Sequence, residues 1–341
     1  VLDMKNNEII LNSRPSGFPS AANFSHATAE IGNPAAGQML VRNIYMSVDP
    51  YMRGRMNDTK SYVPSFKIGE PLSGGVVGQV VSSNAGPFKE GDYITGMGNW
   101  ADYQLTDGAG WSQVSPALAP LSNYLGVLGM PGMTAYVGLT EVAGLKKGDS
   151  VFCSAASGAV GQVVGQIAKN MGCHVAGSAG RQEKIDLIKA TCGYDDAFNY
   201  KTEENLGAAV RRVCPDGVDV YFENVGGPQL EAVLANLNFK ARIAVCGLIA
   251  SYNAKSLDDL PPGPRNLMML IGLAAKMEGF IVSFYPEACK KWIEIGAGWM
   301  KEGKLNYRET ITDGLENAPE TFMGMLRGEN VGKALVKIAD E

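Results

Sequence analysis

The sequence predicts an α/β protein that combines a doubly wound parallel sheet of the Rossmann type with a smaller unit of short β-strands. Three observations support this fold class. The sequence pattern changes near residue 126. Before it, short apolar runs are separated by glycine and proline, and after it, runs typical of strands alternate with stretches typical of helices. A glycine-containing turn lies at the first strand–helix junction of this second part. With 341 residues, the chain is also long enough for two domains.

The first 125 residues carry runs typical of strands in a small β-barrel or sandwich, at 39–45, 74–81, 93–96 and 103–105. The second part predicts six strands, at 150–153, 174–178, 197–199, 218–223, 242–246 and 280–282. The helices predicted between and after them cover 159–171, 182–192, 203–213, 228–237, 266–276 and 287–302. This alternation implies a parallel sheet with right-handed crossovers, and the sixth strand is expected at its edge.

The turn after the first of these strands favours a bound dinucleotide. A strand that turns through small residues into a helix directs backbone N–H groups and the positive end of the helix dipole at one point, which suits a pyrophosphate. Of the pattern G-x-G-x-x-G, Gly158 and Gly161 are present and Ala156 replaces the first glycine. The residues of this turn that we expect to belong to the cofactor site are Ser157, Gly158, Ala159, Val160 and Gly161.

The residues after the second strand favour NADPH over NADH. NAD sites usually carry an acidic residue about 20 positions after the glycines, at the end of the second strand. Here that place falls at 178–181, and no carboxylate occurs before Glu183. Arg181 and Lys184 are instead placed to bind a 2′-phosphate, Arg through two parallel donors and Lys as a point charge.

Composition argues against several partners. A net charge of -5 disfavours nucleic acid, because phosphate backbones are bound by clustered Lys and Arg. No apolar run approaches the roughly 18 residues that cross a bilayer, so no membrane partner is expected. Six cysteines without a C-x-x-C pair suit a reduced, cytoplasmic protein. With only two histidines, His26 and His174, no zinc site is expected.

Several segments together resemble the zinc-independent medium-chain dehydrogenase/reductase family, in the branch of leukotriene/prostaglandin reductases, alkenal double-bond reductases and curcumin reductases. They are VDPYMRGRM (48–56), GMPGMTAY (129–136), AASGAVGQVVGQIAK (155–169), AGRQEK (179–184), DVYFENVGG (219–227), AVCGLIASYN (244–253) and NVGKALVKI (330–338). The resemblance implies a GroES-like β-barrel catalytic domain at 1–125 and 300–341, a Rossmann NADPH-binding domain at 126–299, and an active site in the cleft. It also implies a homodimer.

The same resemblance implies roles for individual residues. Lys184 and Tyr200 would hold the 2′-phosphate end of NADPH, and Asn330 would close the site from the C-terminal segment. The ribose and nicotinamide would lie against Asn224, Cys246, Phe280, Ile281 and Val282, with Met130 and Thr134 at the border of the nicotinamide. Gly180 and Gly247 belong to the same expected cofactor site.

The expected reaction is reduction of a carbon–carbon double bond conjugated to a carbonyl. It needs a hydride, which NADPH supplies, and a donor to the developing enolate oxygen. Tyr252, in the loop after the fifth strand, is the expected donor, because its neutral phenol can bind the oxyanion. Tyr51 is the second candidate, as donor or pocket wall. Tyr62 could cover the substrate pocket, which Met130 would also border.

Other interpretations stay open from the sequence. A quinone reductase of the crystallin-like branch would use the same cofactor half, although the VDPYM and SYN segments favour the first function. An NADPH-binding sensor or structural protein without turnover is the third possibility. The apolar edge strand at 280–282 suggests pairing with a second copy. Asp49 and Arg53, four residues apart, are expected to pair as part of the scaffold.

Overall fold

The structure is a computed structural model that describes residues 4–84 and 86–341. Its contacts divide the chain into two units. The first unit runs up to Leu125 and includes Glu309–Glu341, and the second unit is Gly126–Arg308. The second boundary falls later than the expected 299/300 because the Gln166 side chain bonds to the main chain of Asn306 in both directions, each at 2.7 Å. The backbone N–H of Arg308 also donates to Gln162, at 3.0 Å.

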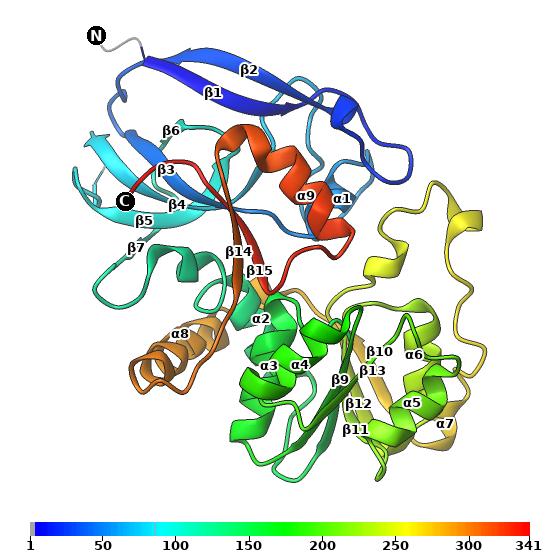
Figure 1. Ribbon diagram of the computed structural model, residues 1–341. Helices are drawn as coiled ribbons and strands as arrows, with labels where there is room; N and C mark the ends of the chain where they lie inside the picture. The colour runs from blue at the N-terminus through cyan, green and yellow to red at the C-terminus, as the bar shows by residue number, and fades with distance from the viewer. Residues whose placement is uncertain (1–3, 85) are drawn as a thin grey trace. The chain divides into compact units, whose positions relative to one another are not determined.

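The second unit is a doubly wound parallel sheet, which confirms the predicted fold class. Its strands are β8 (Ser150–Cys153), β9 (His174–Ala179), β10 (Asp196–Asn199), β11 (Val218–Glu223), β12 (Leu237–Val245) and β13 (Lys276–Gly279). They pair in parallel in the order β10-β9-β8-β11-β12-β13. The helices α3 (Ala159–Asn170) and α4 (Gln182–Thr191) lie on one side of the sheet, and α5 (Leu206–Val213) and α6 (Gly227–Leu234) lie on the other (Figure 1).

Aromatic and aliphatic side chains fill the space between this sheet and its helices. The Phe152 ring lies 5.8 Å from the rings of both Phe198 and Tyr221, and all three are buried. Val210 and Val233 close this core from α5 and α6. Each fully buried side chain of this size contributes about 1.5–3 kcal/mol relative to exposure, so the core holds the sheet as a rigid platform.

Two predicted elements of the second unit are wrong. The helix expected at 266–276 is only α7 (Met269–Gly272), because Ala274 has a φ of 48° and turns the chain out of the helix. β13 begins two residues after Ala274, at Lys276, so the sixth strand precedes the expected 280–282. Phe280 instead follows the strand and packs edge-on against Phe222, with ring centroids 6.2 Å apart. The prediction that the sixth strand lies at an edge of the sheet is correct, but Lys276–Gly279 form it rather than 280–282.

Two further helices complete the second unit. These are α2 (Met130–Val137) and α8 (Pro286–Lys301), the latter close to its expected range. The buried Trp292 of α8 stacks on Tyr136 of α2, with centroids 5.7 Å apart, and its indole N–H donates to the Val127 carbonyl at 2.9 Å. Gly132 must lack a side chain, because a Cβ there would lie 1.8 Å from that same carbonyl oxygen.

The first unit is predominantly β-structure. Its strands are β1 (Met4–Leu11), β2 (Phe24–Ile31), β3 (Met39–Ser47), β4 (Ser73–Ser83), β5 (Tyr93–Asn99), β6 (Tyr103–Thr106), β7 (Ser112–Val114), β14 (Glu309–Asp313) and β15 (Lys333–Lys337), with helices α1 (Tyr51–Arg55) and α9 (Ala318–Leu326). The main sheet has the order β14-β15-β3-β4-β5-β7, and β6 pairs with β3. The C-terminal strand β15 is antiparallel to β3, so the two separate stretches of chain that make up this unit share one sheet (Figure 1). β1 and β2 form a separate antiparallel pair.

A buried ion pair joins these two stretches of chain. The Lys333 ammonium donates to the Asp49 carboxylate at 3.1 Å, to the Val48 carbonyl at 2.8 Å and to the Ala334 carbonyl at 2.9 Å. Both side chains are almost fully buried, and the Ser47 hydroxyl also donates to Asp49. The expected pairing of Asp49 with Arg53 is therefore wrong. Arg53 instead donates to the Gly17 carbonyl at 2.7 and 3.2 Å and to Asn57 at 2.8 Å.

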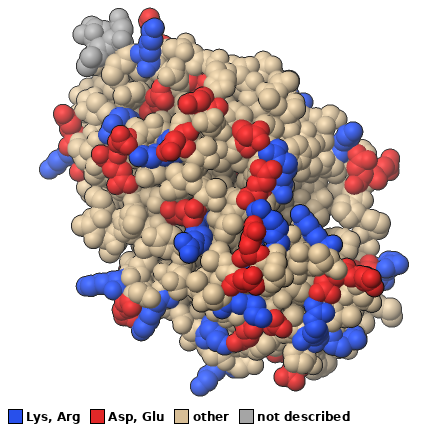
Figure 2. Space-filling model, in the orientation of Figure 1, with Lys and Arg blue, Asp and Glu red and all other residues tan. Residues whose placement is uncertain are grey.

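Charged side chains of both signs are interspersed on the face drawn in Figure 2. Several form exposed pairs, such as Lys189 with Asp196 at 2.8 Å and Lys290 with Glu287 at 3.0 Å. Such pairs contribute little stability. The described residues on this face form no single-sign patch of the kind that nucleic acid binding requires.

Replacement of Lys333 by Met should destabilise the first unit strongly. The change leaves the Asp49 carboxylate buried without its cation, which costs about 3–5 kcal/mol. Urea unfolding followed by far-UV circular dichroism measures the loss. Lys337→Met, on the same strand but paired with the exposed Asp340, should cost less than about 1 kcal/mol. Equal stability of K333M and the unmodified protein would contradict the assignment.

Candidate active site

The carboxyl ends of β8, β11 and β12 form the candidate site of the second unit. The strand order changes direction between β8 and β11, since β9 follows β8 on one side while β12 follows β11 on the other. In doubly wound sheets, ligands bind outside the carboxyl ends of the strands at such a switch point. The loops that begin at Ser154, Asn224 and Cys246 all leave the sheet at this edge.

The turn between β8 and α3 has the geometry of a phosphate cradle. Ala155 adopts a φ of 50°, which reverses the chain, and the Ala156 N–H donates to the Ser178 carbonyl at 2.9 Å. Gly158 caps α3 in an extended conformation. At Gly161, a Cβ would lie 2.6 Å from the carbonyl oxygens of Ala155 and Ala156, so only glycine fits. The first-turn N–H groups of a 12-residue helix thus face the turn, as pyrophosphate binding requires.

A buried hydrogen-bond network connects this turn to the neighbouring loop. The Glu223 carboxylate is fully buried and accepts from the Ser154 hydroxyl at 2.8 Å and from the Val225 N–H at 2.6 Å. The Asn224 N–H donates to the Ser154 hydroxyl oxygen at 2.9 Å, and the Asn224 amide donates to the Ser154 carbonyl at 2.8 Å. Burial raises the pKa of Glu223, and these donors oppose the rise. The network fixes the orientation of the Asn224 loop.

Ser154 and Glu223 were missed by the sequence analysis. The signal that could have identified Glu223 is an acidic residue directly after the apolar run 220–222, at the carboxyl end of strand β11. A buried carboxylate at a strand end must find donors nearby, and backbone N–H groups of the following loop are the closest available.

A cluster of cations follows β9. Lys184 is only 6% exposed. Burial lowers the pKa of its amine to about 8, and the positive charges of Arg181 and Lys201 lower it further. Arg181 forms an ion pair with Glu183 at 3.1 Å. Gly180 leaves room beside them, because a Cβ there would lie 3.2 Å from both the Tyr200 hydroxyl and the Lys201 side chain. Lys201 was not singled out from the sequence, although it directly follows Tyr200.

Mutual repulsion in this cluster makes it receptive to an anion. The positive charges of Arg181 and Lys201 disfavour the charged form of Lys184, and a doubly charged phosphate would stabilise all three cations together. The expected 2′-phosphate residues lie at the carboxyl ends of two neighbouring strands of the second unit, with Gly180, Arg181 and Lys184 after β9 and Tyr200 directly after β10. These side chains fit a phosphorylated dinucleotide better than an unphosphorylated one, because no carboxylate of the described residues replaces the expected acid at 178–181.

Tyr252 lies directly over the end of β12. Its phenol oxygen accepts from the Leu248 N–H at 3.3 Å, and a Cβ on Gly247 would lie 2.9 Å from the same oxygen. The half-buried ring is therefore held at a fixed height above the Gly247 backbone. Cys246 precedes this loop, and burial, with the nearby Glu223, raises the pKa of its thiol to about 12. Cys246 is accordingly a neutral wall rather than a nucleophile.

The long loop after Tyr252 is anchored at its far end. The Glu231 carboxylate on α6 accepts from the Arg265 side chain at 2.6 and 3.0 Å, and the Asn266 amide donates to the Glu231 carbonyl at 3.0 Å. Pro261 lies close to Gly227, whose Cβ would be 3.4 Å from the proline Cβ. Between Tyr252 and these anchors, Leu257 is 84% exposed.

The remaining predicted residues of the second unit are distributed over two segments. Thr134, on α2, is buried and its hydroxyl donates to the Met130 carbonyl at 2.7 Å, while Met130 itself is half-exposed. Phe280, Ile281 and Val282 follow β13 and lead into a short 3-10 helix (Val282–Phe284). A Cβ on Gly138 would lie 2.8 Å from the Phe280 ring, so this ring is tightly packed rather than mobile.

The first unit holds the other three predicted residues in two places. Tyr51 lies in α1, and its phenol interacts with Tyr62 and Arg55, which places these three side chains together. Burial raises the pKa of Tyr51, and Asp49 raises it further, so the phenol stays protonated. Asn330 lies instead in the turn before β15, where its amide donates to the Gly332 carbonyl at 2.7 Å.

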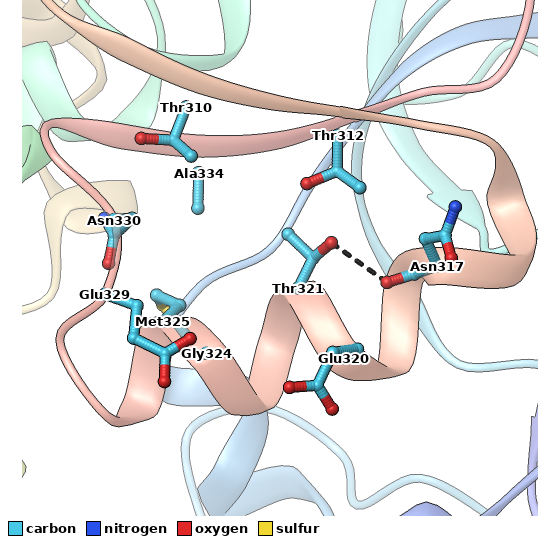
Figure 3. Close-up of a pocket in the computed structure, with 10 residues that line it drawn as sticks. All are labelled: Thr310, Thr312, Asn317, Glu320, Thr321, Gly324, Met325, Glu329, Asn330 and Ala334. Atoms are coloured by element: carbon cyan, nitrogen blue, oxygen red, sulfur yellow. Dashed lines mark hydrogen bonds between the residues drawn. The ribbon is translucent and has the colours of Figure 1, made fainter.

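Asn330 lines a pocket of about 270 Å³ between α9, β14 and β15 (Figure 3). Thr310 and Thr312 point into it from β14, and Thr321 on α9 donates to the Asn317 carbonyl at 2.9 Å. Neither Tyr51 nor Tyr62 is among the residues that line this pocket. Its carboxylates, Glu320 and Glu329, both bond to Arg327.

Within residues 4–84 and 86–341, no three His, Cys, Asp or Glu side chains are grouped so that they could hold a metal ion. His174 bonds through Nε2 to the Val213 carbonyl at 2.7 Å and lies 3.5 Å from Asp195 through Nδ1. In the same part of the chain, no helix is both long and apolar enough to cross a bilayer.

Two family models match the chain. The model described as the N-terminal domain of oxidoreductase matches residues 7–114, and the model described as zinc-binding dehydrogenase matches residues 159–295. Together they fall on the first and second unit, respectively.

Characterised relatives match over nearly the full length. The chain is 44% identical to a 2-alkenal reductase (NADP(+)-dependent) of Nicotiana tabacum, over 99% of both proteins. It is 42% identical to an NADPH-dependent curcumin reductase of Escherichia coli, over 99% of this chain and 98% of the relative. Among solved structures, CurA from Vibrio vulnificus in complex with NADPH matches with a TM-score of 0.93 and 42% identity, over 98% of this chain and 100% of CurA. This neighbour also supports the Rossmann and GroES-like fold class.

Replacement of Gly161 by Ala should weaken dinucleotide binding by at least roughly tenfold, about 1.4 kcal/mol. The new Cβ would collide with the Ala155 and Ala156 carbonyl oxygens at 2.6 Å, so the turn must move away from the helix start. Fluorescence titration with NADPH measures the affinity. Gly298→Ala is the matched control, because nothing lies within 4 Å of its Cβ on α8. Unchanged affinity in G161A would show that the turn does not contact the ligand.

Proposed function

Because the chain belongs to the medium-chain dehydrogenase/reductase family, in the branch of the leukotriene/prostaglandin, alkenal and curcumin reductases, we propose that it reduces the carbon–carbon double bond of α,β-unsaturated ketones and aldehydes with NADPH. The observation that carries this proposal is the near full-length similarity to an alkenal reductase and a curcumin reductase. The CurA structure with NADPH supports the choice of cofactor.

The residues of the second unit suit this cofactor. Ser157, Gly158, Ala159, Val160 and Gly161 would face the pyrophosphate, and Gly180, Arg181, Lys184 and Tyr200 the 2′-phosphate. Asn224, Cys246, Gly247, Phe280, Ile281 and Val282 would line the ribose and nicotinamide, together with Met130 and Thr134. Asn330, which belongs to the first unit, is proposed to contribute from the C-terminal segment. When bound, NADPH supplies the hydride that the β-carbon receives.

The protein's own contribution is a hydrogen-bond donor for the enolate oxygen. We assign this role to Tyr252, because Gly247 and the Leu248 N–H fix the height of its phenol oxygen above the end of β12. A preorganised donor needs no reorganisation as charge develops on the substrate oxygen. Tyr51 is assigned to the substrate pocket with Tyr62 and Met130, as a second donor or as a wall.

The reaction is proposed to proceed without a metal. The chemistry needs no Lewis acid when a phenol stabilises the enolate. The donor set also argues against zinc, because the two histidines lie in different units and no described Cys, Asp or Glu group joins either of them in a metal-binding cluster. Six free cysteines suit a reducing compartment, and we place the protein in the cytoplasm.

The edge strand β13 is proposed to pair with that of a second copy. β13 is the last strand in the sheet order, so its backbone N–H and C=O groups lie along an edge of the sheet. Met277 on the strand is 40% exposed, and Phe284 just beyond it is 74% exposed. An edge of this kind is available for sheet extension, and an isologous contact would produce a homodimer.

Replacement of Lys184 by Met should weaken NADPH binding by roughly 10- to 100-fold, because a charge-assisted bond contributes about 1.5–3 kcal/mol. NADH binding should change little, since NADH lacks the 2′-phosphate. Titration of the variant with both dinucleotides measures the difference. Lys189→Met, on the exposed side of α4 and paired with Asp196, is the control. Equal losses for NADPH and NADH would rule out the phosphate role.

The same lysine should make NADPH affinity depend on pH. Its lowered pKa of about 8 means that the amine begins to lose its proton near pH 8 in the absence of ligand. A bound phosphate favours the charged form and raises that pKa, so binding takes up a proton and affinity falls as the pH rises above 8. This fall should be absent for NADH and in K184M.

Replacement of Tyr252 by Phe should lower kcat by about 100-fold or more, the usual effect of removing one oxyanion donor. The dissociation constant for NADPH should stay within about twofold, because the lost hydroxyl acts on the substrate oxygen. Stopped-flow oxidation of NADPH with a 2-alkenal and a benzalacetone-type ketone measures both. Tyr285→Phe, at the start of α8, serves as the matched control. Full activity of Y252F on several enones would refute the assignment.

A further inference from the structure

Arg55 in the first unit is held in one orientation beside the substrate-pocket tyrosine. Tyr51 and Arg55 occupy the two ends of the five-residue helix α1, one turn apart and therefore on the same side. Their side chains share a hydrogen bond. The Arg55 Nε donates to the Pro64 carbonyl at 3.0 Å and Nη1 to the Ser73 carbonyl at 3.2 Å. The guanidinium carbon lies 4.0 Å from the centre of the Phe66 ring.

The positive charge of Arg55 has no carboxylate to balance it in the described chain. The groups that act on its pKa are its own burial, which lowers it, and the Tyr51 and Tyr62 phenols, which raise it. A partly desolvated cation without a counter-ion is unfavourable. The carbonyls and the ring that surround it orient the guanidinium but do not neutralise it.

The neighbouring Arg53 shows what a structural arginine looks like in the same helix. It is 1% exposed, and its nitrogens bond to the Gly17 carbonyl and to Asn57. Arg55 differs because it is only half-buried and lies beside Tyr62, which is 59% exposed. A guanidinium has five N–H donors, and three protein acceptors surround this one. Donors therefore remain for an incoming anion.

We propose that Arg55 binds a carboxylate that the substrate carries away from its conjugated double bond, so that the protein favours enones and enals with an anionic end. Arginine suits this ligand because its planar donors match the two carboxylate oxygens. Tyr51, polarised by the guanidinium, adds a third donor. The inference rests on the proposed function, in which Tyr51 lines the substrate pocket, and it makes Arg55 a specificity-determining residue.

The test compares a straight-chain 2-alkenal that bears a terminal carboxylate with its methyl ester. We expect kcat/KM of the unmodified protein to be roughly 10- to 100-fold higher for the acid, the range of one charge-assisted bond. In Arg55→Gln this ratio should fall to about one through a higher KM for the acid, with kcat little changed, as for loss of uniform binding. Arg55→Lys, which keeps the charge, should retain part of the preference.

Controls separate binding from structure. If Arg55→Gln merely disturbed the structure of residues 57–66, kcat/KM would fall equally for acid and ester and their ratio would stay intact. That result would overturn the inference. Arg42→Gln, on β3 and bonded to Gln79 at 3.4 Å, should keep both the activity and the ratio. If the unmodified protein reduces acid and ester equally well, the inference is wrong while the proposed function stands. This comparison does not depend on whether R55Q folds. Reduction of neither compound would refute both.

Discussion

The candidate site of the second unit depends on one interaction, the bond between the Ser154 hydroxyl and the buried Glu223 carboxylate. It connects the carboxyl ends of β8 and β11, the two strands between which the sheet changes direction. On one side of it lies the turn that leads to Gly161, and on the other lies the loop that carries Asn224. Because both segments are bonded to the same pair of side chains, a shift in either one would strain the other.

The first unit depends in a similar way on the buried pair of Asp49 and Lys333. Asp49 directly precedes α1, and Lys333 opens β15, only three residues after Asn330. The ion pair therefore fixes two segments that carry proposed site residues with respect to each other within this unit. Burial of two opposite charges is a poor source of net stability, but loss of either partner is costly, so the pairing specifies one register of β15 against β3.

Local signals made much of this molecule predictable from its sequence. Alternating strands and helices, the small residues around Gly158 and the missing acid at 178–181 are all encoded within short windows. What failed depends on tertiary structure. β13, with the sequence KMEG, has no apolar pattern and is a strand only because β12 offers it an edge. Asp49 was paired with the nearby Arg53, whereas its partner lies 284 residues away. The proposed roles of Glu223 and Lys201 depend on neighbours that lie close to them only in the folded chain.

The segment after Tyr252 is anchored near both ends, at Gly247 and Leu248 on one side and at Glu231 through Arg265 on the other. Only the middle of this segment, around the exposed Leu257, lies outside those anchors. Mutations in this exposed middle stretch can therefore accumulate without displacing the phenol of Tyr252 or the turn that leads to Gly161. The sequence of this stretch and the geometry of the loop that carries Tyr252 can thus evolve separately.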